Sequence, residues 1–282
     1  MLLASLFLLL APLNSARAMS LTDWCQQVTP RLPKVSDRDC RSAQLNASGA
    51  RSVNGFDLMI RDFPAKTLHG TRRKQAIRIL LVGGIHGDEQ TAAAVVFKWM
   101  AHLQKTSTPD VQWRVAPILN PDGLLAKKPK RVNAHGVDLN RNFPTPDWDK
   151  EASRYWMIKT KSDPRRFPGT APLSEPESRW VFDTIQNFKP HVIISVHAPF
   201  GVLDLDGPAK PPRRFGRLVY NRVGVYPGSL GNYSGMHQAI PVLTIELPHA
   251  VKMPVDAEVL RIWQDMQLWI RRNISAISAQ KK

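Results

Sequence analysis

Apolar segments of two kinds alternate along this chain of 282 residues. Short runs rich in Val, Ile and Leu occur at 77–82, 191–197 and 241–247, and runs of this length and composition predict buried strands. Longer segments with apolar residues every three or four positions predict helices. Strands that alternate with helices are typical of an α/β fold. We therefore predict three α/β/α layers around a mixed, largely parallel central sheet.

Two weaker patterns predict further strands. Residues 56–63 alternate loosely between apolar and polar side chains. The run 111–119 is a second strand candidate, and it ends at Asn120-Pro121-Asp122-Gly123, a strong turn sequence. Both segments would extend the same sheet.

Three helices are predicted from apolar spacing and from start signals. One covers 90–105 and another begins near Asp256, each with apolar residues on one face. Ser174-Glu175-Pro176-Glu177 resembles a capping box and predicts a helix that extends to about Phe188. The elements from 56 to 275 together predict one large domain.

The first eighteen residues resemble a secretory signal peptide. Leu2 to Leu13 is almost uninterrupted apolar sequence, and Ala16-Arg17-Ala18 has the small-x-small form of a cleavage site. The apolar stretch is too short to span a bilayer comfortably. We expect cleavage after Ala18 and a periplasmic or secreted protein without a transmembrane segment; an uncleaved membrane anchor is the alternative.

The two cysteines agree with an oxidising compartment. Cys25 and Cys40 are the only cysteines of the chain and lie shortly after the expected cleavage site. We predict one disulfide that closes a loop in a polar, irregular lead-in over 19–55. Two buried free thiols are the alternative.

The chain is strongly basic. Its formal net charge is +16, and it becomes +15 after cleavage because only Arg17 leaves with the first eighteen residues. Such a charge attracts anionic polymers and membrane surfaces. An exported chain without a recognisable nucleic-acid module argues against nucleic acid as the partner, so an anionic cell-wall or lipid surface fits better. The charge is also compatible with solubility alone.

Chemistry-bearing side chains gather at three predicted strand ends. His86 and Glu89 follow the strand 77–82 within a glycine-rich turn, His197 closes a second strand, and Glu246 lies near the end of a third. Functional sites of α/β folds form at the carboxyl ends of strands, and imidazole and carboxylate are ligands of catalytic Zn²⁺. A carboxylate such as Glu246 inside a buried strand is costly unless it is paired or functional; a structural salt bridge is the alternative.

The loop 131–143 carries a possible anion-binding pair. Arg141 with Asn140 could hold a terminal carboxylate through a forked, charge-assisted pair of hydrogen bonds. The alternative is a polar surface loop rich in turn-forming residues.

Taken together, these motifs resemble those of the zinc carboxypeptidases of the M14 family. The chain contains, in the family's order, His-Gly-Asp-Glu, Asn-Pro-Asp-Gly, Gly-Val-Asp-Leu-Asn-Arg-Asn, Ser-Val-His and Thr-Ile-Glu-Leu, spread over roughly 56–270. It looks most like the short bacterial branch that contains murein peptide amidases and peptidoglycan carboxypeptidases. The resemblance implies that residues 56–275 form a zinc peptidase catalytic domain.

The resemblance implies one Zn²⁺ per chain and a role for each residue around it. His86, Glu89 and His197 would hold the ion, with a water in the open position. Asp138 matches the carboxylate that orients the first histidine. Glu246 matches the general base that deprotonates the water and then protonates the leaving amine.

Further positions match the groups that contact the substrate. Arg131 is similar to the arginine that stabilises the oxyanion, and Asn140 and Arg141 match the pair that binds the free C-terminal carboxylate. Larger members of the family carry a mobile tyrosine before the last strand, but the spacing of Tyr226 and Tyr233 departs from that pattern. The sequence therefore assigns a catalytic role to neither tyrosine and leaves their roles open.

These expectations converge on a periplasmic zinc metallopeptidase that trims peptidoglycan stem peptides beside meso-diaminopimelate. Asp204 and Asp206, which follow the third predicted ligand, could meet the cationic amine of that residue; a solvated acidic turn is the alternative. Two other functions compete, a zinc deacylase of N-acyl amino acids of the aspartoacylase kind and a non-catalytic cell-wall-binding protein. The sequence leaves open which stem-peptide bond is cut.

Overall fold

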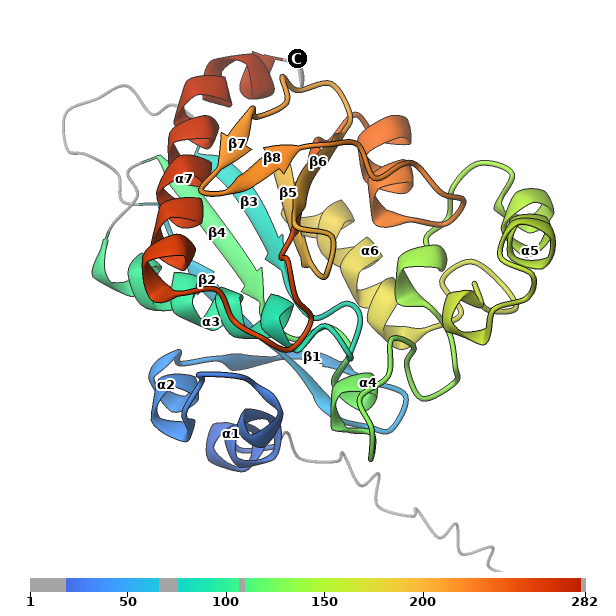
Figure 1. The fold of residues 1–282 in the computed structure, drawn as a ribbon, viewed down its shortest axis with the longest axis horizontal. Helices are drawn as coiled ribbons and strands as arrows, with labels where there is room; N and C mark the ends of the chain where they lie inside the picture. The colour runs from blue at the N-terminus through green and yellow to red at the C-terminus, as the bar shows by residue number, and fades with distance from the viewer. Residues whose placement is uncertain (1–18, 66–75, 107–109, 280–282) are drawn as a thin grey trace, which may run out of the picture.

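A mixed sheet forms the centre of the molecule (Figure 1). The computed structural model describes residues 19–65, 76–106 and 110–279, and within these residues nine strands are joined in the order β1-β2-β4-β3-β5-β9-β6-β8-β7. Strands β4, β3, β5 and β9 pair in parallel, whereas β2 and β6 flank them in antiparallel orientation. The strands are β1 (Asn46–Arg51), β2 (Asp57–Phe63), β3 (Ile77–Val82), β4 (Val111–Ala116), β5 (Val192–His197), β6 (Val202–Asp206), β7 (Arg214–Phe215), β8 (Leu218–Tyr220) and β9 (Val242–Glu246).

Helices cover both faces of the sheet, which confirms the predicted α/β class. Alternate residues of β3 point to opposite faces: Leu81 belongs to the core formed with α3 and α7, and Leu80 to the core formed with α6. Trp99 of α3 donates a hydrogen bond to the carbonyl of Val259 in α7 at 3.2 Å, which joins the two helices. The helices are α1 (Leu21–Val28), α2 (Asp37–Ser42), α3 (Gln90–Lys105), α4 (Pro121–Leu125), α5 (Trp148–Lys159), α6 (Pro176–Phe188) and α7 (Asp256–Ala279), with short helical turns η1 (Thr29–Arg31), η2 (Leu139–Arg141), η3 (Pro164–Arg166) and η4 (Gly231–His237).

The register of the parallel strands brings their carboxyl ends together. Val82 at the end of β3 lies opposite Ser195 of β5, and His197 at the end of β5 lies opposite Glu246 at the end of β9. The glycine-rich turn after β3 and the last residues of β5 and β9 therefore share one edge of the sheet. This edge is where the candidate chemistry of the sequence is concentrated.

The N-terminal lead-in is more ordered than the sequence predicts. Residues 19–55 were expected to be irregular, and this is wrong, because α1 and α2 form there and β1 pairs with β2. Ser20 and Ser36 accept hydrogen bonds from the first turns of α1 and α2, so each short helix has a side-chain N-cap. The predicted disulfide between Cys25 and Cys40 is present and joins the two helices.

The start of α6 and the end of β4 differ from what the sequence predicts. The capping box expected before α6 does not form: Glu175 is the N-cap residue without a side-chain cap, and the carboxylate of Glu177 accepts a hydrogen bond from Asn133 instead. The strand predicted over 111–119 ends at Ala116. Asn120 then caps the short helix α4 by accepting from the backbone of Gly123.

The predicted signal peptide lies outside the described residues. Within the part of the chain that the structure describes, no helix combines the length and the apolar character needed to cross a bilayer.

Candidate active site

The turn that follows β3 carries His86 and Glu89 to the edge of the sheet. Gly87 lies between them, and a Cβ atom added there would come within 2.2 Å of the carbonyl carbon of Gly123. The two motif loops, His-Gly-Asp-Glu and Asn-Pro-Asp-Gly, are therefore in backbone contact, which a larger side chain at Gly87 would prevent. Glu89 is the N-cap residue of α3, so its position is set by the start of that helix.

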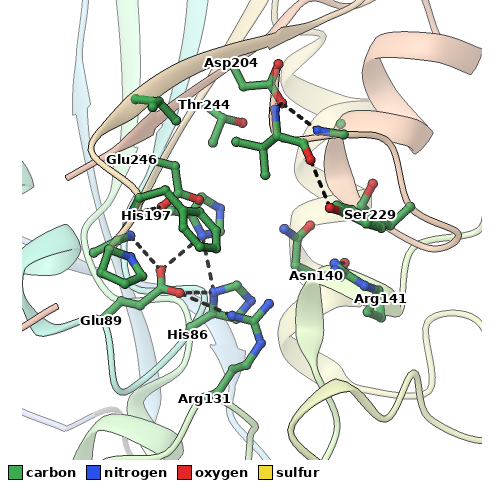
Figure 2. A pocket seen from close by; sticks show the side chains of 18 of the residues that line it. His86, Glu89, Arg131, Asn140, Arg141, His197, Asp204, Ser229, Thr244 and Glu246 are labelled. Atoms are coloured by element: carbon green, nitrogen blue, oxygen red, sulfur yellow. Dashed lines mark hydrogen bonds and ion pairs between the residues drawn. The ribbon is translucent and has the colours of Figure 1, made fainter. Parts of the chain in front are cut away.

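His86, Glu89 and His197 converge on one point (Figure 2). Nδ1 of His86 lies 2.7 Å from one carboxylate oxygen of Glu89, and Nδ1 of His197 lies 3.1 Å from the other. The two Nδ1 atoms are 3.3 Å apart. The three side chains are buried, and their ligand atoms lie within 4.8 Å of one another.

Neighbouring groups fix the far side of each imidazole. Nε2 of His86 lies 3.1 Å from Oδ1 of Asp138, and Nε2 of His197 lies 2.9 Å from Oγ of Ser195. With the Nε2 protons directed at these oxygens, both Nδ1 lone pairs face the shared space. Two imidazole nitrogens and a carboxylate that face one another are a donor set for a metal such as Zn²⁺, so the residues fit the predicted metal.

Arg131 stands beside the three candidate ligands. Its Nε donates to Asp138 at 2.9 Å and its Nη1 lies 3.3 Å from Glu89. Burial raises the pKa of the Asp138 carboxyl, but the charges of Arg131 and His86 outweigh it and hold that pKa well below its usual range. Arg131 therefore faces an ionised carboxylate, and it also lines the cavity in front of His86.

Glu246 lies at the end of β9 next to His197, with 6% of its surface exposed. Burial, helped by the negative charge of Glu89 and opposed by His197, raises the pKa of Glu246 to about 7. Its carboxylate accepts a long hydrogen bond, 3.4 Å, from the backbone nitrogen of Phe200. Within the described chain Glu246 is in no ion pair with Lys or Arg, so the geometry favours a functional carboxylate over a structural salt bridge.

Asn140 and Arg141 occupy the opposite wall of the cavity, as Figure 2 shows. Arg141 is buried, its Nη1 donates to the carbonyl of Asn140 at 2.7 Å, and its guanidinium lies 4.4 Å from the centre of the Tyr226 ring. Oδ1 of Asn140 accepts from the backbone of Leu230 at 2.8 Å, which leaves its amide nitrogen for other partners. The pair faces the three candidate ligands across the cavity.

The cavity has a volume of about 620 Å³ and contains residues that the sequence did not single out. Thr244 lies two positions before Glu246 and so shares its face of β9, a signal that the period of a strand could have revealed. Arg222 also lines the cavity, but it lies on a loop without a local pattern. Tyr226, which the sequence singled out without assigning it a role, lines the cavity as well. Tyr233, in contrast, is part of the core, where it stacks on Phe143.

Comparison with known proteins agrees with this geometry. A sequence model of the zinc carboxypeptidase family (peptidase M14) matches residues 37–203, which include the three candidate ligands and end before Glu246. Murein peptide amidase A of Vibrio campbellii is 28% identical over 219 residues, which cover 75% of this chain and 81% of that protein. The Escherichia coli K12 protein of the same name is 32% identical over 129 residues, 44% of this chain and 50% of that protein, so that match spans about half of the relative's length.

Solved structures share the fold. The structure of a murein-tripeptide amidase from Escherichia coli O157 has a TM-score of 0.53 and 25% identity, with 80% of this chain and 91% of the other covered. Carboxypeptidase A of Helicoverpa armigera has a TM-score of 0.66 at 16% identity, with 89% and 75% covered, and so shows likeness of fold alone. The family match over more than half of the sequence, together with this fold, identifies the chain as a member of the M14 zinc carboxypeptidase family of hydrolases.

Proposed function

We propose that this chain is an exported zinc hydrolase that acts on peptidoglycan stem peptides and cuts the bond before a terminal diaminopimelate residue. The observation that carries this proposal is the position of Arg141 and Asn140 across the cavity from His86, Glu89 and His197. A substrate whose free carboxylate binds to Arg141 presents its last peptide bond to the opposite wall. The arrangement thus supports removal of a C-terminal residue.

The residues of the chain suit the steps of hydrolysis. His86, Glu89 and His197 would hold Zn²⁺, which would supply a Lewis acid and lower the pKa of a bound water towards neutral. Glu246, with its pKa raised to about 7, can take a proton from the attacking water and return it to the leaving nitrogen. Arg131 is placed beside the ligands to stabilise negative charge that develops on the carbonyl oxygen.

The relatives and the charge support a cell-wall substrate. The Vibrio campbellii and Escherichia coli K12 relatives are named murein peptide amidase A, and the similar Escherichia coli O157 structure is that of a murein-tripeptide amidase. The net charge of +16 favours residence near anionic polymers. In a tripeptide the diaminopimelate residue is itself C-terminal, so an amidase cut before it and a carboxypeptidase cut are the same reaction.

Two structural features support export and cleavage after Ala18. The Cys25–Cys40 disulfide suits an oxidising compartment. The backbone nitrogen of Met19, which cleavage would convert into the terminal amine, donates to the buried carboxylate of Asp57. A charged amine at this position would pair with Asp57 more strongly than an amide does.

Mass spectrometry of purified muropeptides, before and after incubation with the zinc-loaded protein, tests the proposal. We expect tripeptide muropeptides to lose one diaminopimelate residue, and tripeptides with an amidated C-terminus to resist because Arg141 then lacks a carboxylate partner. The matched control is Glu246→Gln, which should leave all muropeptides unchanged. Unchanged muropeptides with the wild-type protein would overturn the proposal, and turnover of N-acyl amino acids in the same assay would then indicate the deacylase activity.

A further inference from the structure

Asp206 is a buried carboxylate of the cavity with one oxygen that accepts no hydrogen bond from the part of the chain that the structure describes. It is 5% exposed and lines the cavity, and its Oδ1 accepts no hydrogen bond from any described residue. A buried carboxylate in this state is costly, and such groups are normally paired with a cation or a hydrogen-bond donor. The hydrolysis described above makes no use of it.

The packing around Asp206 keeps its side chain in this place. A Cβ atom on Gly231 would lie 1.9 Å from Oδ2 of Asp206, and one on Gly235 would lie 2.7 Å from its Cβ. The two glycines of η4 therefore leave the space that the carboxylate occupies. Among the described residues the fold accommodates this carboxylate without giving it a hydrogen-bond donor, which favours a partner that comes from a bound ligand.

In Asp204, two positions earlier on β6, both carboxylate oxygens accept hydrogen bonds. Its Oδ1 accepts from the backbone nitrogen of Leu205 at 2.7 Å, and its Oδ2 accepts from Val223 at 3.0 Å and from Gly224 at 3.4 Å. Its hydrogen bonds are therefore used to hold the loop that follows β8. Of the two acidic residues that the sequence singles out, only Asp206 is left for a ligand.

The loop held by Asp204 carries a positive charge to the same cavity. Arg222 immediately precedes Val223, is exposed and lines the cavity. Its charge reaches Asp206, because it opposes the rise in the pKa of that carboxyl. The cavity thus contains a free carboxylate and an accessible guanidinium near each other, while Arg141 serves the substrate's terminal carboxylate on another element.

Asp206 and Glu246 lie at different levels along the strands that carry them. Asp204 is opposite Thr244 and Asp206 opposite Val242 on β9, whereas Glu246 lies four residues further along β9. Four strand residues span roughly 13 Å. A substrate side chain must therefore be long to run from the bond beside Glu246 to Asp206.

We propose that Asp206 and Arg222 bind the ammonium and carboxylate groups at the far end of a long side chain that ends in an amino-acid group, with Asp204 fixing the loop that carries Arg222. This inference rests on the proposed function and deepens it. Diaminopimelate has such a side chain, because its far end repeats the amine and carboxylate of its near end. Lysine has only the amine there, and 2-aminopimelate has only the carboxylate.

Equilibrium binding of these three free amino acids to the zinc-loaded protein tests the subsite by calorimetry. We expect meso-diaminopimelate to bind at least tenfold more tightly than lysine or 2-aminopimelate. Asp206→Asn should weaken the binding of diaminopimelate and of lysine at least tenfold and leave the affinity for 2-aminopimelate within twofold. Arg222→Gln should weaken the binding of diaminopimelate and 2-aminopimelate and leave that of lysine within twofold. The matched control is Arg213→Gln, because Arg213 is exposed and does not line the cavity; this variant should change the binding of none of the three.

Two results would overturn the subsite. One is equal affinity of the wild-type protein for the three ligands, and the other is an equal loss for all three in both variants. Arg222 is exposed, so its variant keeps the test decisive even if Asp206→Asn were to fold poorly. The muropeptide assay tests the proposed reaction separately. If the three amino acids bind as expected but no muropeptide is cleaved, the subsite is supported and the proposed activity is refuted. If muropeptides are cleaved but the three amino acids do not bind as expected, the activity is supported and the subsite is refuted.

Discussion

The ionisation of Asp206 opposes folding at neutral pH. Burial, and then the negative charge of Asp204, raises the pKa of Asp206 to about 6 from an ordinary value of 3.8. The folded chain therefore binds more protons than the unfolded chain between these values, so the contribution of Asp206 to stability falls as pH rises from about 4 to about 6. A buried carboxylate that lowers stability in this way is more simply explained by ligand binding than by a structural role.

Asp206→Asn should consequently stabilise the protein above pH 6. We expect the free energy of unfolding at pH 7.5 to increase by about 1 to 2 kcal/mol, after allowance for partial solvent screening, and the gain to vanish near pH 4. Urea denaturation at pH 4.5 and 7.5 measures this difference. Asp204→Asn is the matched control and should lose stability at pH 7.5, because Asp204 accepts backbone hydrogen bonds; an Asp206→Asn protein less stable than wild type at pH 7.5 would contradict the argument.

Glu246→Gln should separate metal binding from hydrolysis. Glutamine keeps the size of the side chain but cannot accept the proton, so kcat should fall by roughly 10² to 10⁴ while the metal content stays at one zinc per chain. Atomic absorption and muropeptide turnover on the same sample provide the two measurements. His86→Ala should lose both zinc and activity; a Glu246→Gln protein without zinc would instead make Glu246 a ligand.

At the level of elements, the loop before η4 supports the wall of the cavity that carries Arg141. Gly228 has φ +73°, and a Cβ atom there would lie 1.9 Å from the carbonyl oxygen of Arg141. Gly228→Ala should therefore displace Arg141 and raise KM for tripeptides at least tenfold. Gly136 has a similar φ of +77° with nothing within 4 Å of an added Cβ, so Gly136→Ala should cost about 1 kcal/mol of stability and leave KM unchanged. Equal KM values for the two variants would refute the role of this contact.

A metal at the candidate site would join the ends of β3 and β5 and the start of α3. Ligand binding to the folded state alone stabilises it by about 2.7 kcal/mol at a free metal concentration one hundred times Kd. We expect a chelator to lower Tm by roughly 5 to 10 °C for a chain of this size, and added zinc to restore it. The His86→Ala protein should show no such shift in calorimetry, whereas a chelator effect of equal size in that variant would place the metal elsewhere.

The sequence predicts the elements that combine a strong pattern with a motif. The apolar run before His86 and the runs that end at His197 and Glu246 identify buried strands, and the rule that sites form at carboxyl ends brings the three together. The helices of 19–50 were missed because they are six to eight residues long and rely on serine caps. The state of Asp206 could not be predicted, because it depends on glycines of η4 that are distant in sequence.

On the scale of the whole molecule, one buried carboxylate of the domain contacts the N-terminal segment at several points. Asp57 begins β2, is 4% exposed and accepts from Nε of Arg51 at 2.8 Å, while its backbone carbonyl accepts from the indole of Trp24 at 3.0 Å. The backbone nitrogen of Met19 donates to its second oxygen. Strand β1, helix α1 and the expected new chain end thus meet at Asp57. Pairing of β1 with β2 and the disulfide between α1 and α2 add further links between the N-terminal segment and the domain.

Cleavage after Ala18 should therefore strengthen the folded molecule. The amide of Met19 already donates to a charged acceptor, and such a bond contributes about 1.5 to 3 kcal/mol. A free amine on Met19 adds its own positive charge to this bond, so we expect the free energy of unfolding to rise by a further amount of about 1 kcal/mol. The comparison is between a chain that begins at Met19 and one that begins at Ala18, whose amine is displaced by one residue. In the Asp57→Asn background the two chains should have the same Tm, because the carboxylate charge is gone. If the chain that begins at Ala18 is equally stable in the wild-type background, the charged amine is not bound by Asp57, and the preference for this cleavage position loses its structural support.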